Sequence, residues 1–272
     1  MIFNKTNITI AITTVFTLFV FAACVRERDT DIELVKEEVL GEYAYDNALA
    51  IIDDAATKNT GDLLANYKTS GYCATIIHDT MSNPRSIIVD FGSVNCMSND
   101  GRKRRGKIFA SYTQQYPTAG NVVSISFDSY FVDDIQIDGK SEVSNRGKNI
   151  LGQTYFDIQT EGKMVKEIAT DTIYWNATRL RTWIQGESTP VWGDDVYELE
   201  GIGNGKNANR QYYAMNITEP LYKDVSCRFI TKGKIDMQPQ GKALRSLTYG
   251  DGTCDSKAEV EINNKTFNVD LY

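Results

Sequence analysis

The fold class is decided by the last hairpin of the chain, which reads KAEVEINNKTFNVD at residues 257–270. Apolar and polar side chains alternate on both sides of Asn263 and Asn264. Asparagine tolerates positive φ, so this pair suits a two-residue type I′ turn. The apolar side chains of both strands then share one face, as a half-buried antiparallel hairpin requires. The apolar pairs in this register are Val260 with Phe267 and Ala258 with Val269.

The same alternation continues upstream of the hairpin. Stretches with the pattern of strands lie at residues 123–127, 173–175, 180–184, 196–202 and 213–217. The pairs Asp138-Gly139 and Glu161-Gly162 are typical of turns between strands. We therefore predict a mainly β fold with an antiparallel sheet. A sandwich and an open, strongly curved sheet both fit this pattern.

One segment has helical periodicity. Between residues 40 and 56, apolar side chains recur at spacings of three and four. They are Leu40, Ala44, Ala48, Ile51, Ile52 and Ala55. Gly61 follows as a stop signal. The pattern predicts one N-terminal α-helix ahead of the β region.

Four cysteines mark two similar segments. Each segment opens with C-x-x-I, at Cys73 and Cys227, and closes with aromatic-Gly-x-x-x-Cys, at Cys96 and Cys254. An even number of cysteines in an exported chain suggests disulfides, although the number alone allows three pairings. Each segment has the pattern of a strand, a turn and a returning strand. We therefore predict Cys73–Cys96 and Cys227–Cys254, in two similar units at about 72–110 and 226–272. In the chain-entropy model, each bond stabilises the fold by about 3–4 kcal/mol.

Residues 1–23 have the pattern of a secretory signal peptide. Lys5 precedes an uncharged run from Ile8 to Ala23, which is shorter than the roughly 20 residues that span a bilayer. The run ends in Phe21-Ala22-Ala23-Cys24, which resembles the bacterial lipobox, where the thiol is acylated and the chain is cut before it. We expect a lipid anchor on Cys24. The alternative is an ordinary secretory signal or membrane anchor with an incidental cysteine.

The residues after the cysteine are polar and charged, and we expect residues 24–39 to form a tether. Acidic residues close to the anchor can direct such proteins to the cell surface, but Arg26 and Arg28 interrupt them here. A solvated linker explains the composition equally well. The expected address is the outer membrane, either at the cell surface or on the periplasmic side.

The composition fits a globular domain and argues against nucleic acid as a partner. The 272 residues are 42% hydrophobic and 24% charged, with a net charge of −7. Nucleic-acid binding needs clustered cations. The one basic run, residues 102–107, fits the exposed side of a hairpin offset by acids, and contact with an anionic polysaccharide or lipid headgroup is the alternative. No C-x-x-C occurs, so a metal site is not expected. Asx-type turn chemistry explains the oxygen-rich turns at 98–101 and 250–252 without calcium.

The sequence lacks a catalytic constellation. His78 is the single histidine and no G-x-S-x-G occurs, so we expect His78 in a turn or at the surface. A glycosidase needs two carboxylates across a cleft. Adjacent acids such as Asp133-Asp134 and Asp194-Asp195 point to opposite faces of a strand. We predict no catalytic residue, no cofactor and no enzymatic activity.

Three tryptophans form the candidate binding site. Trp175, Trp183 and Trp192 lie close together on strand-like segments. Exposed tryptophan rings would suit sugar stacking. Aromatic side chains are also favoured in the cores of sheets, which is the competing interpretation.

Several blocks of the chain resemble a family of Bacteroidota envelope lipoproteins. Residues 249–258 read YGDGTCDSKA and residues 262–267 read INNKTF, which is similar to the YGxGTCDxKA…INxKTF signature at the C-terminus of that family. Further similar blocks are DFG at 90–92, DGRKRRGK at 100–107, RTW at 181–183 and WGDDVY at 192–197. The resemblance covers about residues 72–272. It implies an envelope address and a β-rich fold, and it brings no activity or ligand.

Two functions follow as hypotheses, both for one domain at residues 40–272. The first is a lipid-anchored, non-enzymatic envelope protein that binds a glycan or a protein partner through the three tryptophans. The second is a periplasmic carrier that holds a lipid, or the acyl chain of a lipoprotein, in an apolar cavity under a curved sheet.

Overall fold

The structure, a computed structural model, describes residues 29–57, 64–68, 73–115, 118–166, 172–189 and 191–272. The helical elements are α1 (Glu33–Thr57) and the 3-10 turn η1 (Trp192–Asp194). The strands are β1 (Leu64–Lys68), β2 (Thr75–Asp79), β3 (Arg85–Asp90), β4 (Cys96–Met97), β5 (Lys103–Tyr112), β6 (Val122–Val132), β7 (Ile135–Lys148), β8 (Thr154–Lys166), β9 (Thr172–Gln185), β10 (Val196–Lys206), β11 (Tyr212–Asp224), β12 (Lys232–Pro239), β13 (Arg245–Asp251), β14 (Lys257–Ile262) and β15 (Lys265–Asp270).

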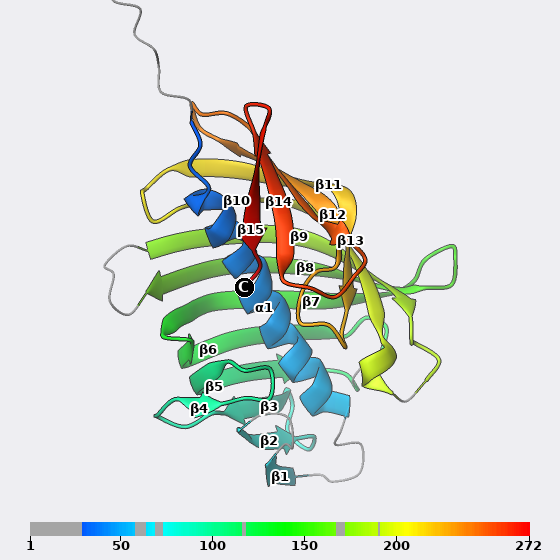
Figure 1. Cartoon of the computed structure of the whole chain (residues 1–272). Helices are drawn as coiled ribbons and strands as arrows, with labels where there is room; N and C mark the ends of the chain where they lie inside the picture. Colours follow the sequence, from blue (N-terminus) through cyan, green and yellow to red (C-terminus); the bar gives the residue numbers. More distant parts are fainter. Residues whose placement is uncertain (1–28, 58–63, 69–72, 116–117, 167–171, 190) are drawn as a thin grey trace, which may run out of the picture.

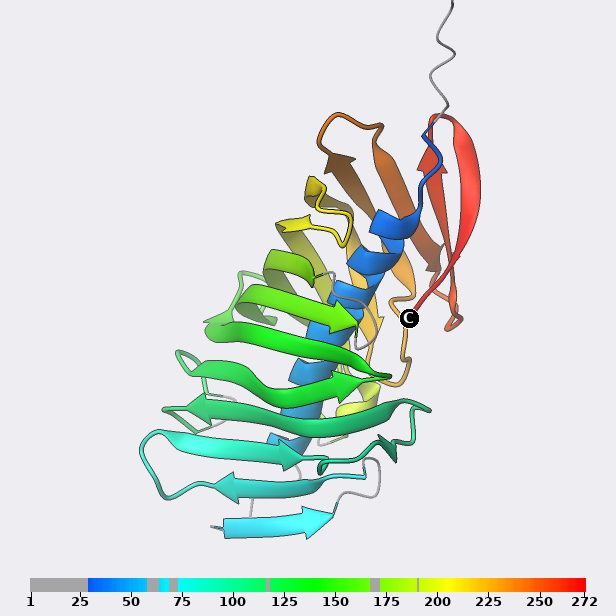
Figure 2. The ribbon, with the colours of Figure 1, turned by 90° about the vertical axis from the view of Figure 1, so that its left-hand side faces the viewer.

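All of these strands belong to one antiparallel sheet, which confirms the mainly β prediction. Strands that follow one another along the chain pair with one another from β1 to β15, except that β3 pairs with β5 and the short β4 pairs with β5 alone. The sheet curls, so that β13, β14 and β15 turn toward the side on which α1 lies (Figures 1 and 2). Of the two predicted arrangements, the structure has the open, strongly curved sheet and not the sandwich.

Helix α1 lies obliquely across the strands, in the hollow of the curved sheet (Figure 1). Its apolar side chains are buried on more than one side, because sheet and loops cover most of its circumference. They include Leu34, Val35, Val39, Leu40, Ala44, Ala48, Leu49, Ile51, Ile52 and Ala55. The helix is therefore the centre of the hydrophobic core. In the described part of the chain, no helix is long and apolar enough to cross a membrane.

The predicted helix is confirmed, but its predicted start is wrong. It begins at Glu33, so residues 33–39 of the predicted tether are helical and packed on the sheet. The carboxylate of Asp31 accepts the backbone N–H of Glu33 at 2.9 Å and satisfies one free donor of the first turn. The acids in this stretch suggested a solvated tether, yet Glu38 is buried and accepts the hydroxyl of Tyr213 at 2.8 Å. The predicted stop at Gly61 lies outside the described residues.

The C-terminal hairpin has the predicted register. Val260 pairs with Phe267, and Ala258 pairs with Val269. The turn residues Asn263 and Asn264 have φ angles of 53° and 60°, as a type I′ turn requires. The inward side chains of β14, including Val260, are buried. Both predicted disulfides, Cys73–Cys96 and Cys227–Cys254, are present.

Two expected turns prove to be the middle of long strands. Asp138-Gly139 lies within β7 and Glu161-Gly162 within β8, and the two glycines pair with each other. A Cβ atom on Gly162 would come within 2.5 Å of the ring of Tyr45, so the helix packs where the strands have no side chain. The hydroxyl of Tyr45 donates to the carbonyl of Asp138 at 2.8 Å. Similarly, the stretches 173–175 and 180–184 are one continuous strand, β9.

Candidate functional site

A cleft of about 880 Å³, which we call the helix cleft, opens where α1 meets two loops of the sheet and the turn η1. One loop joins β4 to β5 and the other joins β11 to β12. The lining residues are Asp46, Asn47, Ala50, Asp54, Asn99, Asp100, Gly193, Lys223, Val225, Ser226, Cys227, Arg228 and Phe229. The helical residues Asp46, Ala50 and Asp54 follow one another at intervals of four, so they line the cleft from one face of α1.

The two disulfide-closed units form two walls of the helix cleft. Cys227 opens the second unit, is bonded to Cys254 at its end, and lines the cleft itself. Asn99 and Asp100 follow Cys96, which closes the first unit. The guanidinium of Arg228 donates to the carbonyl of Asp100 at 2.7 Å and so joins the two loops across the helix. The repeat seen in the sequence thus brings two distant segments together over α1.

Asp100 is fixed by a buried cation. The side chain of Arg104 is fully buried, and its Nη2 lies 2.6 Å from Oδ2 of Asp100. The same nitrogen donates to Oδ1 of Asn47 on the helix at 2.8 Å. Burial raises the pKa of Asp100, but the hydrogen bond and the charge of Arg104 outweigh it, so the pKa lies below its usual value. Asp100 is therefore an ionised wall of the cleft at neutral pH.

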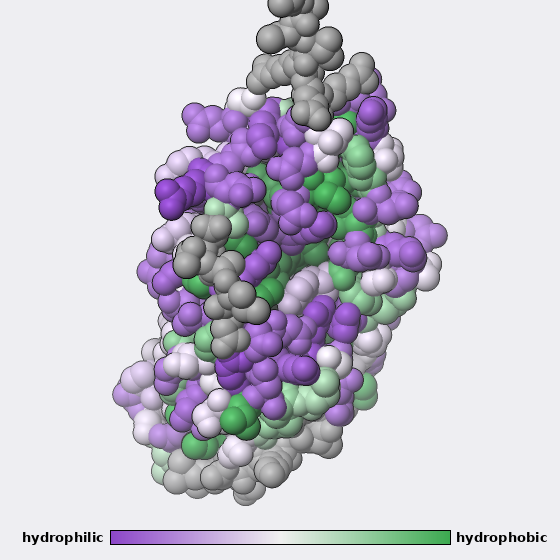
Figure 3. All heavy atoms as spheres, turned by 60° about the vertical axis from the view of Figure 1, so that its left-hand side comes forward, coloured by the Kyte–Doolittle hydropathy of each residue, from purple (hydrophilic) through white to green (hydrophobic). Residues whose placement is uncertain are grey.

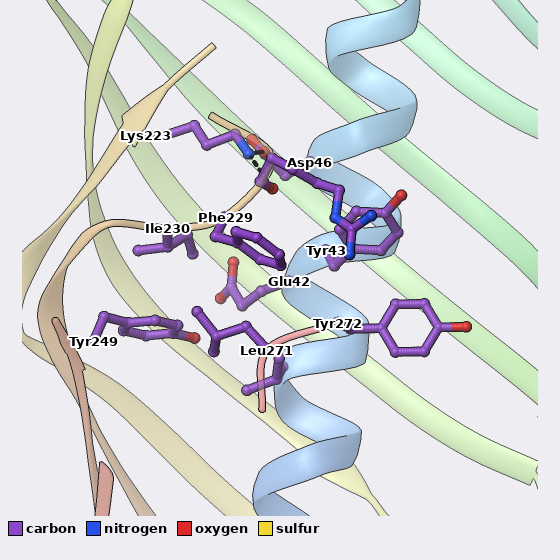
Figure 4. Close-up of a pocket in the computed structure, with 11 residues that line it drawn as sticks. Glu42, Tyr43, Asp46, Lys223, Phe229, Ile230, Tyr249, Leu271 and Tyr272 are labelled. Atoms are coloured by element: carbon purple, nitrogen blue, oxygen red, sulfur yellow. Dashed lines mark hydrogen bonds and ion pairs between the residues drawn. The ribbon is translucent and has the colours of Figure 1, made fainter. Parts of the chain in front are cut away.

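Lys223 ties the opposite wall to the helix. Its Nζ lies 3.5 Å from Oδ2 of Asp46, an ion pair drawn in Figure 4, and donates to the carbonyl of Arg228 at 3.0 Å. Beside it, the guanidinium of Arg228 lies 4.7 Å from the ring centroid of Phe229. The end of β11 and the loop that follows it therefore present two cations, Lys223 and Arg228, and the aromatic ring of Phe229.

A smaller pocket continues from the helix cleft, because both are lined by Asp46, Lys223, Arg228 and Phe229. In Figure 4, side chains of α1 face those of the β11–β12 loop and of the C-terminal segment. The smaller pocket has a volume of about 20 Å³, which is room for about one water molecule. The hydroxyl of Tyr249, which lines it, is buried and has no hydrogen-bond partner among the described residues. Burial raises the pKa of Tyr249 well above its usual value, so this hydroxyl is a neutral donor.

The lining of the helix cleft presents hydrogen-bond donors and acceptors. Its carboxylates and amides accept hydrogen bonds, and its two cations donate them. Among the described residues, no cluster of three or more His, Cys, Asp and Glu side chains could hold a metal ion. Figure 3 shows one face of the molecule, where hydrophilic side chains dominate and apolar ones gather in a hollow near its middle.

Of the three tryptophans in the predicted site, the structure describes the side chains of Trp175 and Trp183, and Trp175 is not accessible to a ligand. Trp175 is only 3% exposed, stacks on Tyr45 of the helix with ring centroids 5.3 Å apart, and lies against Gly41. Trp183 is half-buried and donates its indole N–H to Asp195 at 3.2 Å. The side chain of Trp192 lies outside the described part of the structure. Trp175 faces the helix because strand alternation points it to the concave side, so it cannot stack on a bound sugar.

His78 also differs from expectation. It is buried in β2, 3% exposed, and hydrogen-bonds to the hydroxyl of Tyr112. Burial lowers the pKa of His78, so it is neutral at pH 7. The expectation of a surface or turn histidine was wrong because strand alternation points this side chain to the inner side, with Ile76.

The charged runs are neutralised locally. Asp133 and Asp134, in the turn between β6 and β7, pair with Arg102 and Arg105, each at 2.6 Å. Lys107 pairs with Asp90 at 3.0 Å. Acids therefore offset the basic run as predicted, but its predicted exposed position is wrong for Arg104, whose side chain is fully buried. Asp195 is buried and its pKa is raised to about 6, first by burial and then by the charge of Asp194.

Sequence reasoning missed the residues of the helix cleft. Asp46, Asp100 and Lys223 are far apart in the sequence, and each looks like an ordinary surface residue. The signal that could have indicated the cleft is the repeat, because its opening motif contains Arg228 and Phe229.

Comparisons of this chain with protein-family models, with curated proteins and with solved structures gave no match.

Proposed function

We propose that this chain is a lipid-anchored protein of the bacterial cell envelope that binds a glycan in the helix cleft and does not act as an enzyme. The supporting observation is the composition of the cleft walls. Asp46, Asn47 and Asp100 offer oxygen acceptors on one side. Lys223 and Arg228 offer donors on the other, beside the ring of Phe229.

A carbohydrate matches this set of groups. Its hydroxyls both donate and accept hydrogen bonds, and the C–H surface of a sugar ring can pack on an aromatic face. Pockets for small ligands range from about 300 to 1,000 Å³, and the helix cleft falls in this range. Because the cleft is lined by carboxylates as well as cations, a neutral or weakly charged glycan fits better than a polyanion.

The envelope address is supported by the sequence alone. The apolar run before Cys24 and the small residues Ala22 and Ala23 favour export and acylation. The carrier hypothesis has less support, since α1 occupies the hollow of the sheet. The smaller pocket has about 20 Å³, far less than an acyl chain needs, and the larger helix cleft is lined mostly by polar and charged side chains.

The ligand proposal is tested by binding of the full chain, solubilised in detergent, to immobilised glycans, followed by calorimetric titration of the best binder. We expect Lys223→Met and Phe229→Ala to weaken binding at least tenfold. Lys140→Met on the outer face serves as the matched control, and thermal unfolding shows that each variant is folded. Equal affinity of cleft and control variants, or no binding to any glycan, contradicts the proposal.

The anchor is tested separately in cells. The Cys24→Ala variant should lose acylation and partition away from the membrane fraction. Unchanged processing and membrane retention of this variant would show that Cys24 is not the anchor.

A further inference from the structure

The first described residues are fixed on the far end of the sheet. Oδ2 of Asp29 lies 2.6 Å from Nη2 of Arg245 in β13, whose side chain is 1% exposed. The amide of Asn263 donates to the backbone carbonyl of Asp29 at 3.1 Å. Lys242 lies 3.5 Å from the carboxylate of Asp31. The N-terminal segment therefore leaves the body at one defined point, beside the β12–β13 and β14–β15 turns (Figure 1).

The Asp29–Arg245 ion pair is expected to stay formed at neutral pH. Partial burial raises the pKa of Asp29, but the hydrogen bond from Arg245 outweighs it and keeps the carboxylate ionised at neutral pH. A buried guanidinium that loses its carboxylate partner is strongly destabilised, so the pair holds the segment in place.

The chain between this point and Cys24 is short. A chain extends at most about 3.3–3.6 Å per residue, so the five residues from Cys24 to Asp29 span at most about 18 Å. If Cys24 carries the lipid, the turns around Asp29 lie within that distance of the bilayer surface. This step rests on the anchor in the proposed function.

Three turns meet at this end, and the charged residues of the turns themselves are all cations, of which Lys242 pairs with Asp31 of the N-terminal segment. The β10–β11 turn at residues 207–211 joins the β12–β13 turn, because Gln211 donates to the carbonyl of Gln240 at 3.2 Å. Residues 207–211, 240–244 and 263–265 contain Arg210, Lys242 and Lys265 but no acid, and all three cations are exposed. Leu244, 44% exposed, adds an apolar side chain.

We propose that Arg210, Lys242, Leu244 and Lys265 form a membrane-contacting surface, here called the turn surface, which rests on anionic lipid headgroups. Cations close to a membrane surface are attracted to its anionic lipids. The helix then runs away from the bilayer. At 1.5 Å per residue, Asp46 and Asp54 lie about 20–32 Å along α1 from Glu33, so the helix cleft is presented away from the membrane.

The test measures the depth of two positions in vesicles. The full chain carries a fluorescent noncanonical amino acid in place of Leu244 or, as control, in place of Ile150. Ile150 is fully exposed in the β7–β8 turn, at the opposite edge of the sheet from the turn surface. The vesicles contain brominated phosphatidylcholine as quencher and 30% phosphatidylglycerol. We expect at least threefold stronger quenching at position 244 than at 150, and a loss of most of this difference in the Lys242→Glu/Lys265→Glu variant. Equal quenching, or stronger quenching at 150, overturns the proposal.

A second arm separates this proposal from the anchor on which it rests. If the natural chain is not acylated, Cys24 keeps a free thiol, because the other four cysteines form disulfides. The full chain is then coupled through Cys24 to a maleimide lipid and measured in the same way. Absence of acylation in cells contradicts the anchor, whereas the quenching ratio of the coupled chain alone decides the turn surface.

Discussion

The two faces of the sheet hold their charges in opposite ways. On the concave face, Arg179 of β9 pairs with Glu42 of α1, and the two side chains are 5% and 4% exposed. On the outer face, Lys140 of β7 and Glu161 of β8 lie 3.2 Å apart, and they are 67% and 71% exposed. Both pairs are in direct contact. The two pairs differ in solvent exposure, because the charged groups of the concave pair lost their hydration when the chain folded and those of the outer pair did not.

Burial decides what each pair contributes. An exposed pair is screened by water and contributes about 0–1 kcal/mol. A buried pair contributes little more as a whole, but the loss of one partner leaves a charge without water or counterion, which costs about 3–5 kcal/mol. The concave face thus uses Arg179 and Arg181 to fix where α1 lies, since a shifted helix would leave Glu42 and Asp53 unpaired. Among the described residues, no helix packs on the outer face, so the ion pairs there do not position one.

The largest effect is expected from Arg179→Met. This substitution leaves Glu42 and the neighbouring Glu38 buried without a cation, so the free energy of unfolding should fall by about 3–5 kcal/mol. Urea unfolding followed by circular dichroism measures it. Replacing Glu42 with Leu in the same variant should restore part of the loss. A loss below 1 kcal/mol for Arg179→Met would mean that the two faces do not differ as described.

The same contrast holds within one strand for aromatic side chains. Trp175 faces the helix at 3% exposure, and the adjacent Tyr174 faces solvent at 45%. We expect Trp175→Ala to lower the free energy of unfolding by about 3–5 kcal/mol, because it leaves a cavity against Tyr45 and Gly41. Tyr174→Ala should cost less than about 1 kcal/mol. Similar losses in the two variants would show that Trp175 is not part of the core.

The pH dependence of stability should come from the concave face. Burial, and next the charge of Glu42, raise the pKa of Glu38 from 4.5 to about 7. An acid with a raised folded-state pKa costs nothing while it is protonated in both states, below about pH 4.5. Above that pH the unfolded state ionises first, so stability falls as the pH rises until about 7, where the folded state ionises as well.

Glu38→Gln removes this titration while keeping an oxygen for the hydroxyl of Tyr213. We expect wild-type stability to fall relative to the variant between pH 4 and pH 8, by on the order of 2 kcal/mol. Chemical unfolding at these two pH values tests the sign. A wild type that gains stability relative to the variant over this range would contradict it.

Local signals in the sequence predicted the local structure well. Asn263 and Asn264 set the register of the last hairpin, because positive φ and strand alternation are properties of neighbouring residues. The cysteine repeat predicted both disulfides because each bond joins two cysteines of the same short segment. The body of α1 followed from the spacing of its apolar residues, and its end at Thr57 is one residue past the predicted one.

What the sequence could not indicate depends on contacts between distant residues. Gly162 looked like a turn residue because no neighbouring residue indicates that the ring of Tyr45 packs against it. That ring leaves no room for a Cβ atom at position 162. Glu37 and Glu38 looked solvated because their partners lie more than 170 residues away, the backbone N–H of Ala208 and the hydroxyl of Tyr213. The helix cleft was missed because the curl of the whole sheet brings Asp100 to Arg228.

A smaller effect is expected at the turn that decides which face each residue of β14 and β15 takes. Asn264 has a φ of 60°, a conformation that costs most residues with a Cβ about 1–2 kcal/mol. Asn264→Ala should therefore lower the free energy of unfolding by about 1 kcal/mol, and Asn264→Gly should be neutral or slightly stabilising. Unfolding titrations of both variants make the measurement. A larger loss for glycine than for alanine would contradict the type I′ turn.

The smallest effect is expected from Lys140→Ala on the outer face. The side chain is 67% exposed, so removing it leaves Glu161 in water rather than in the core. The free energy of unfolding should change by less than about 1 kcal/mol, and raising the salt concentration to 1 M should shrink the difference further because ions screen the pair. Urea unfolding of wild type and variant at low and high salt measures both. A loss above 2 kcal/mol that persists in high salt would mean that this pair is not solvated, and the contrast between the two faces would then rest on side-chain packing alone.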